Sequence, residues 1–128
     1  MRGTLSDQSL IYLQIAQMIS DDILREVYRE DEQVPSTNEL ARGYNINPAT
    51  AAKGLNLLTS DGILYKRRGL GMFVSPGAAE MIRRKRRSEF TGAYILPLIK
   101  EAKSLGMDGG ELLELVRTAI EKGENKNG

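Results

Sequence analysis

The sequence contains no cysteine and no histidine among its 128 residues. Without cysteine it forms no disulfide bond, holds no thiol nucleophile and offers no thiolate to a metal. Without histidine it lacks the commonest general base and the commonest transition-metal ligand of proteins. These absences exclude hydrolytic triads, zinc catalysis and zinc fingers. We therefore expect a binding protein without metal or cofactor, and not an enzyme.

The chain also lacks a long apolar run. No stretch approaches the ~18 consecutive apolar residues of a membrane span, and residues 1–4 open no signal peptide. Its 41% of hydrophobic and 27% of charged residues are ordinary for a soluble globular protein. We expect a cytoplasmic protein without a membrane partner, folded as one domain or as one small domain with an appendage of about 40 residues.

The net charge of +1 conceals a strong segregation of charge along the sequence. Residues 62–88 carry eight lysines and arginines against a single carboxylate, Glu80, whereas residues 1–61 and 89–128 are each net acidic. A basic band between acidic flanks is typical of a protein that binds a polyanion. A solvated charged surface without a ligand is the alternative explanation of the charge alone.

Residues 7–28 predict an amphipathic helix, with Ser6 or Asp7 as its cap. Apolar side chains recur there at spacings of three and four residues: Tyr12, Ala16, Ile19, Ile23 and Val27. Because this stripe covers one helix face, we expect that face to be buried.

Two shorter helices follow, each with its own start signal. Ser36 and Glu39 fit a capping box, in which each side chain bonds to the backbone amide of the other residue. Asn47 is the next cap, and Pro48 stands at the first helical position, where a missing amide hydrogen has no cost. We expect this last helix to end near residue 60.

Residues 63–66 and 72–74 predict two short strands, joined by a turn that contains Gly69 and Gly71. Helix, short helix, turn, helix and then a basic hairpin is the element order of a winged helix-turn-helix. The expected fold is therefore mainly α with a small β-hairpin wing, followed by a C-terminal helical appendage. We place the winged helix-turn-helix domain at residues 1–76.

Residues 77–122 predict a helical dimerisation unit, interrupted at Pro97, and residues 123–128 predict a frayed polar tail. Two helices enclose no core of their own, so their apolar faces must pack on the N-terminal domain or on a second copy of the chain. We favour the second copy. The expected dimer interface consists of apolar residues from both helices: Phe90, Tyr94, Ile95, Leu98, Leu112, Leu113, Val116 and Ile120.

Five short motifs stand at characteristic spacing between residues 8 and 75: Gln14-Ile15 after Tyr12, Pro35-Ser36-x-x-Glu39-Leu40-Ala41, Thr50 three residues into a helix, Leu58-x-x-x-Gly62, and Gly69-x-Gly71-x-Phe73-Val74. Together they resemble the GntR family of bacterial transcription regulators. The short appendage resembles the YtrA-like branch, whose two C-terminal helices form the homodimer. The resemblance implies a DNA-binding regulator.

Two positions depart from the usual family pattern. Asn38 stands where the family usually has the arginine of P-S-x-R, and Asn47-Pro48 stands where it usually has Ser-Arg. The YtrA-like branch has a similar Asn-Pro-x-Thr start, so the second departure agrees with that branch. Together the departures remove two positive charges from the usual DNA-contacting positions.

The resemblance implies that the helix starting at Asn47 enters the major groove by its N-terminal end. We expect DNA contacts from that helix, from the start of the helix before it and from the wing: Ser36, Thr37, Asn38, Asn47, Ala49, Thr50, Lys53, Arg67, Arg68, Gly69 and Gly71. The side chains at positions 47, 49, 50 and 53 should point outward. For Ser36 a purely capping role is the alternative. The Arg83–Arg87 run either approaches flanking phosphates or is a solvated helix face.

These expectations combine into a homodimeric transcription regulator, a repressor that binds a palindromic operator and responds to an unidentified small effector. Two alternatives remain open. A winged helix can serve as a protein–protein interaction module without specific DNA binding. A carboxylate enzyme would use Glu111 and Glu114, although such pairs are common on solvated helix faces.

Overall fold

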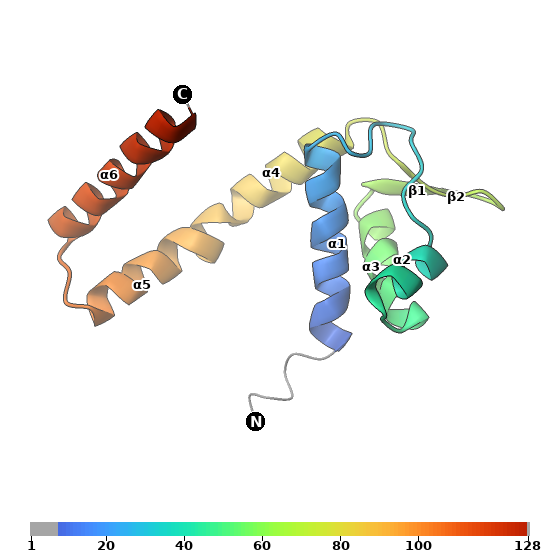
Figure 1. Ribbon diagram of the computed structural model, residues 1–128, viewed down its shortest axis with the longest axis horizontal. Coiled ribbons are helices and arrows are strands. Elements are labelled where there is room, and N and C mark those ends of the chain that lie inside the picture. The colour runs from blue at the N-terminus through green and yellow to red at the C-terminus, as the bar shows by residue number, and fades with distance from the viewer. Residues whose placement is uncertain (1–7, 128) are drawn as a thin grey trace. The chain divides into compact units, whose positions relative to one another are not determined.

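The computed structural model describes residues 8–127, which divide into two compact units between Lys85 and Arg86. Figure 1 labels the elements of the N-terminal unit, which are α1 (Gln8–Leu24), α2 (Thr37–Tyr44), α3 (Pro48–Ser60), β1 (Leu64–Arg67), β2 (Gly71–Val74) and the first part of α4 (Ala78–Phe90). No helix within residues 8–127 is both long enough and apolar enough to cross a bilayer.

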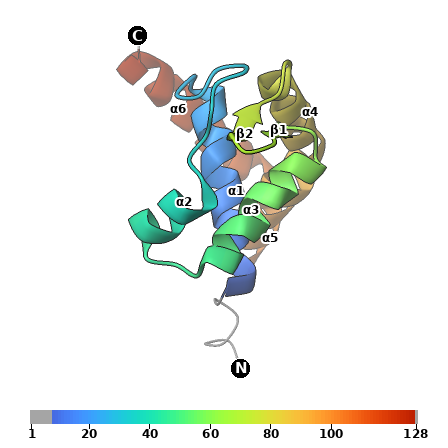
Figure 2. The same ribbon diagram turned by 90° about the vertical axis from the view of Figure 1, so that its right-hand side faces the viewer.

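The core of the N-terminal unit lies between α1, α3 and the hairpin. Its most deeply buried large side chains are Ile19, Leu55, Leu64 and Val74. Figure 2 shows α3 crossing in front of α1. The two helices approach closely at Gly54, where an added Cβ would lie 2.9 Å from Ile15 Cγ2. Glycine therefore permits the packing of α3 on α1.

The start signals of both short helices are confirmed. Ser36 Oγ accepts from the Glu39 amide at 3.1 Å, and Glu39 Oε1 accepts from the Ser36 amide at 2.9 Å. Asn47 Oδ1 accepts from the Ala49 amide at 2.8 Å, and Pro48 is the first residue of α3. Local side-chain chemistry thus fixes where α2 and α3 begin.

The first helix ends at Leu24, four residues before the expected end at residue 28. Glu26 has a φ of 64°, and its amide donates to the Ile23 carbonyl at 3.1 Å, while the Val27 amide donates to the Asp22 carbonyl at 2.8 Å. This pair of bonds is a Schellman motif, which ends a helix. Val27, expected to be buried, is therefore 56% exposed. The expected caps Ser6 and Asp7 lie outside the described residues.

A short extended segment, which the sequence pattern does not indicate, pairs with the hairpin as a third strand-like element. β1 and β2 pair antiparallel, from Leu64 with Val74 to Arg67 with Gly71. Residues 31–34 lie along β2, since the Val34 amide donates to the Met72 carbonyl at 3.0 Å. In Figure 1 this segment passes the hairpin on its way from α1 to α2. The segment that leads into α2 is therefore part of the wing.

The N-terminal unit continues beyond the expected boundary at residue 76, to Lys85. Ala78 and Ile82 of α4 are buried in its core. The Gly77 amide donates to Glu30 Oε1 at 2.7 Å. Lys85 Nζ lies 3.1 Å from Asp61 Oδ2, just after α3. The first turns of α4 thus belong to the winged domain, because apolar contacts hold them there.

The C-terminal unit contains the end of α4, the π-helical segment η2 (Thr91–Ile95), α5 (Leu96–Ser104) and α6 (Gly109–Asn127). The interruption expected at Pro97 is present as a change of helix type directly before it. The Leu96 amide donates to the Thr91 carbonyl, five residues back. Proline has no amide hydrogen and its ring crowds the carbonyl four residues earlier, so a wider turn accommodates it.

The expectation of a frayed tail at residues 123–128 is wrong for residues 123–127, which continue α6 to Asn127. Asp108 caps this helix, because its Oδ1 accepts from the Glu111 amide at 2.8 Å. Arg117 pairs with Glu114 and, at 2.7 Å, with Glu121. Ion pairs at these spacings support an exposed helix, and the polar composition of the tail does not prevent it from being helical.

Candidate nucleic-acid interface

The start of α2 and one face of the hairpin enclose a hollow of about 260 Å³. Its lining residues come from the α2 start, the core and the wing: Pro35, Ser36, Thr37, Asn38, Leu55, Lys66, Gly71 and Met72. The structure thereby brings together four expected DNA-contacting positions, at the α2 start and at Gly71. We call this hollow the α2–wing hollow.

Lys66 lies in the α2–wing hollow, although it is absent from the expected contacts. Side chains alternate along a strand, so Lys66 shares the face of the buried Leu64, whereas Arg67 lies on the opposite face. Its partner across the hairpin is Met72, which also lines the hollow. The alternation of side chains along β1, counted from the buried Leu64, predicts which face of the hairpin carries Lys66.

The first amides of a helix have no partner within the helix and favour an anion. At the start of α2 the capping box already occupies Ser36 Oγ, so the capping role of this serine is real. The bond from the Ser36 amide, followed by the bond from its side chain, lowers the pKa of Glu39. Thr37 is half-buried and Asn38 exposed. The amides and side chains of these two residues remain suited to a phosphate.

At the start of α3, the side chains of Asn47, Ala49 and Lys53 are exposed as expected. For Thr50 the expectation of an outward side chain is wrong, because this residue is only 5% exposed. It lies one turn before Gly54, on the face of α3 that is buried. Its side chain is therefore part of the packing of α3.

The outer face of the wing carries an aromatic pair and an arginine. The rings of Tyr65 and Phe73 stack with centroids 5.8 Å apart, and the Arg67 guanidinium lies 5.0 Å from the Phe73 ring. The Tyr65 hydroxyl donates to Asp31 Oδ1 at 2.7 Å, and this bond is the main cause of its raised pKa. The Arg67 guanidinium is therefore held against the aromatic pair, whereas Arg68 lies exposed at the tip.

Residues 11–74 match the family model of the bacterial regulatory proteins of the gntR family. The chain is also 31% identical over 113 residues to the HTH-type transcriptional regulator YhcF of Bacillus subtilis, covering 88% of this chain and 92% of that protein. The chain belongs to the GntR family. The membership expected from the motifs is thereby confirmed.

Further comparisons agree with this GntR assignment. The HTH-type transcriptional repressor YtrA of Bacillus subtilis is 29% identical over 119 residues, which are 91% of each chain. A solved GntR-family regulator from Bacteroides thetaiotaomicron has a TM-score of 0.67 and 32% identity, covering 88% of this chain and 97% of that one. By contrast, the chain spans only 29% of the length of the longer curated relatives that it matches at 37% identity.

GntR regulators are DNA-binding proteins without enzymatic activity. The alternative of a carboxylate enzyme at Glu111 and Glu114 is therefore not supported by the family. Its fold, mainly helical with a two-stranded wing, is the fold of its solved relatives. The expected fold class is confirmed.

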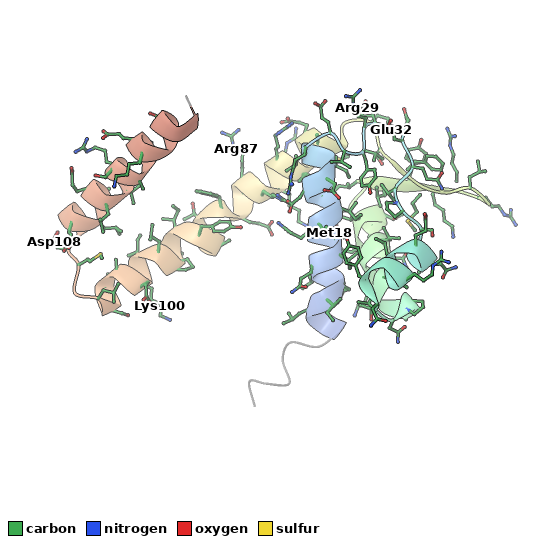
Figure 3. All side chains as sticks on the ribbon, in the orientation of Figure 1. Met18, Arg29, Glu32, Arg87, Lys100 and Asp108 are labelled. Carbon is green, nitrogen blue, oxygen red and sulfur yellow. The ribbon has the colours of Figure 1, made fainter. Side chains whose placement is uncertain are left out.

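The basic run of the GntR protein, Arg83–Arg87, lies on α4 and spans both units. Arg83 lies 3.8 Å from Glu80 within the same helix, and Lys85 pairs with Asp61. Figure 3 shows Arg87 projecting from α4. Part of the run therefore has a structural role that links α4 to the end of α3.

The C-terminal unit buries little of its apolar surface. Of the residues expected at a dimer interface, Ile95, Leu112 and Val116 are half-buried and the rest are exposed. The rings of Phe90 and Tyr94 lie 5.5 Å apart. Between α5 and α6 a hollow of about 220 Å³ is lined almost entirely by apolar residues, among them Leu98, Leu112 and Val116.

Proposed function

We propose that this GntR protein is a homodimeric, sequence-specific transcriptional repressor that binds a palindromic operator. The observation that carries the proposal is the α2–wing hollow, which Lys66 lines together with the first turn of α2. A cation beside the free amides of a helix start is suited to bind a phosphate group.

In this proposal each part of the N-terminal unit has one role on DNA. The start of α3 enters the major groove with Asn47, Ala49 and Lys53. Thr37 and Asn38 at the α2 start, together with Lys66, hold the phosphate backbone beside it. The wing brings its tip and Arg67 to the neighbouring groove, where a guanidinium suits both phosphate and a narrow minor groove.

The repressor part of the proposal is supported by YtrA, a relative of similar length that is named a transcriptional repressor. A two-fold symmetric dimer requires two symmetric half-sites, and the spacing of such half-sites is about one helical turn of DNA. We place this activity in the cytoplasm, where the operator lies. An unidentified small molecule would relieve repression by binding one of two dimer states more tightly.

The homodimer is supported by the exposed apolar side chains of the C-terminal unit. Leu113 is 73% exposed and Ile120 55% exposed, one above the other on α6. Apolar patches of this kind mark interaction surfaces. The expected result of sedimentation analysis is a dimer for the unchanged protein and a monomer for Leu113→Glu. Lys100→Glu, an exposed change on α5, is the control and should stay dimeric.

Fluorescence anisotropy on a duplex from upstream of the protein's own gene tests the proposed function. We expect this duplex to be bound at least ~10³-fold more tightly than a scrambled duplex, with several counterions released in a salt series. Equal, weak and salt-sensitive binding of both duplexes leads to selection from random sequence. If that selection yields no preferred site, the proposal of sequence specificity is wrong, and a protein–protein interaction module takes its place.

A further inference from the structure

The wing tip of the N-terminal unit is tied to the segment that leads into α2. Gln33 lies in that segment, and its Nε2 donates to the Leu70 carbonyl at 2.7 Å, across 37 positions of sequence. The backbone of Gln33 also forms a bridge with Phe73 of β2. The Leu70 amide closes the tip by donating to the Arg67 carbonyl at 2.9 Å. The Gln33 side chain therefore bonds to the end of the hairpin, while its neighbours Glu32 and Val34 bond along the edge.

Gly71 leaves the space that the Gln33 side chain occupies. A Cβ on Gly71 would lie 2.6 Å from Gln33 Nε2, and the φ of Gly71 is +118°. At Gly69, on the other side of the tip, a Cβ would meet nothing within 4 Å. The two wing glycines thus differ, because Gly69 serves the turn alone, whereas Gly71 also admits the glutamine.

The tip carries two exposed side chains, Arg68 and Leu70, the latter 61% exposed. Among the described residues, Gln33 is the one residue outside the hairpin whose side chain hydrogen-bonds to residues 68–70. The anchor itself is fixed, since the neighbouring Val34 is buried and its amide donates to the Met72 carbonyl at 3.0 Å. Gln33 therefore bonds to the tip from a segment that is itself hydrogen-bonded to β2.

From this geometry we propose that Gln33 is a positioning residue for DNA recognition. It sets the wing tip relative to the start of α2, which begins a few residues later at Thr37. Arg68 and Leu70 then reach one groove while the α2 start holds a phosphate of the same duplex. Apolar tips of this kind contact the minor groove in other DNA-binding proteins. This inference rests on the proposed function.

Gln33→Leu tests the proposal, because leucine keeps an apolar stem of similar size and cannot donate to the Leu70 carbonyl. We expect binding of the preferred duplex to weaken about 5-fold, the order of one lost hydrogen bond, and the salt dependence to fall by up to about one counterion. Gln14→Leu on α1 is the matched control and should bind as the unchanged protein does. Both variants should be folded at the temperature of the binding assay, which a thermal unfolding curve of each checks.

A double-mutant cycle separates positioning from a general structural role. In the background Arg68→Ala with Leu70→Ala, the change Gln33→Leu should have no further effect on DNA affinity, since the groups it positions are gone. Gly71→Ala should weaken binding like Gln33→Leu, because its methyl group displaces the glutamine. Gly69 also has a positive φ, of +78°, but a Cβ there would meet open space, so Gly69→Ala should weaken binding less.

The results distinguish a failure of the proposed function from a failure of the positioning role of Gln33. If the unchanged protein prefers no duplex, the proposed function fails and the role of Gln33 falls with it. If the unchanged protein does prefer one and Gln33→Leu binds it equally well, only the positioning role is overturned. The positioning role is also overturned if Gln33→Leu weakens binding just as much in the background Arg68→Ala with Leu70→Ala.

Discussion

The Nζ of Lys53 lies 4.3 Å from the centre of the Tyr12 ring, so a cation of α3 rests on an aromatic side chain of α1. A lysine at a protein surface has a long, flexible stem. Contact with the ring face restricts that freedom before any DNA is present. The charge that α3 would bring to the duplex in the proposed complex is therefore placed partly by α1.

A double-mutant cycle measures this contact. We expect Tyr12→Leu and Lys53→Met to show a coupling of about 0.5–1 kcal/mol in the free energy of unfolding by urea, since the pair is a cation–π contact at an exposed site. Tyr12→Phe keeps the ring and should keep the coupling. Purely additive effects would show that the two side chains do not interact in solution.

Ser36→Ala removes the serine half of the capping box at α2. We expect the free energy of unfolding to fall by about 1 kcal/mol, because the Glu39 amide loses its acceptor. Urea titration followed by circular dichroism measures the change. Ser60→Ala, at the end of α3, is the control and should change stability little. A Ser36→Ala variant as stable as the control would contradict the role of the box.

The pKa of Glu39 is lowered, first by the bond from the Ser36 amide and then by the bond from its side chain. A carboxyl group with a lowered pKa in the folded state stabilises the protein above its ordinary pKa, and this contribution is lost as the pH falls through the lowered value. Carbon-detected NMR titration should find Glu39 ionised below the ordinary range. In Ser36→Ala its pKa should rise part of the way, since the amide of residue 36 remains.

Glu26 ends α1 in the left-handed region, with a φ of 64°. Glycine adopts this conformation without strain, so we expect Glu26→Gly to stabilise the protein by about 0.5–1 kcal/mol. Thermal unfolding measures the gain. Arg25→Gly, at the adjacent position without a positive φ, should instead destabilise it. Loss of stability in Glu26→Gly would mean that the Schellman motif does not form in solution.

Lys66 lines the α2–wing hollow and should contact a phosphate. We expect Lys66→Ala to weaken binding to specific and scrambled duplexes alike, and to lower the slope of log affinity against log salt by about one. Lys100→Ala, an exposed change in the C-terminal unit, should leave the slope unchanged. Equal slopes for both variants would show that Lys66 does not reach the DNA.

The elements whose boundaries depend on local chemistry could be predicted from the sequence. Ser36 and Asn47 begin their helices because their side chains satisfy amides only two or three residues away. The positive φ of Gly69 likewise belongs to a turn of a few residues. Such signals need no knowledge of the remaining fold, so the order of elements followed from them.

The buried face of α3 could be predicted only in part. Thr50 and Gly54 lie on that face beside Leu55, yet neither is an apolar residue that a search for periodicity would count. The burial of Thr50 follows from the close approach of α1 at Gly54, which is a property of the packed structure. At the end of α1 the error is the reverse, because Val27 fits the apolar period after the helix has already ended.

The contacts that complete the candidate site join distant parts of the chain. Gln33 reaches the wing because residues 31–34 pair with β2 in one register. Lys66 faces the α2 start because the same register places that face of the hairpin against it. Registers between separated segments follow from the packed core and not from the local sequence, so neither residue was among the expected contacts.

The loop between α1 and α2 has an unusual constraint on its length. Three of its side chains hydrogen-bond to three separate positions later in the chain: Glu30 to Gly77, Asp31 to Tyr65 and Gln33 to Leu70. Surface loops ordinarily tolerate insertions. Here one inserted residue after Glu30 would turn the following side chains to the opposite side of an extended segment, away from their partners. We therefore expect related sequences to keep the residue count of this exposed loop.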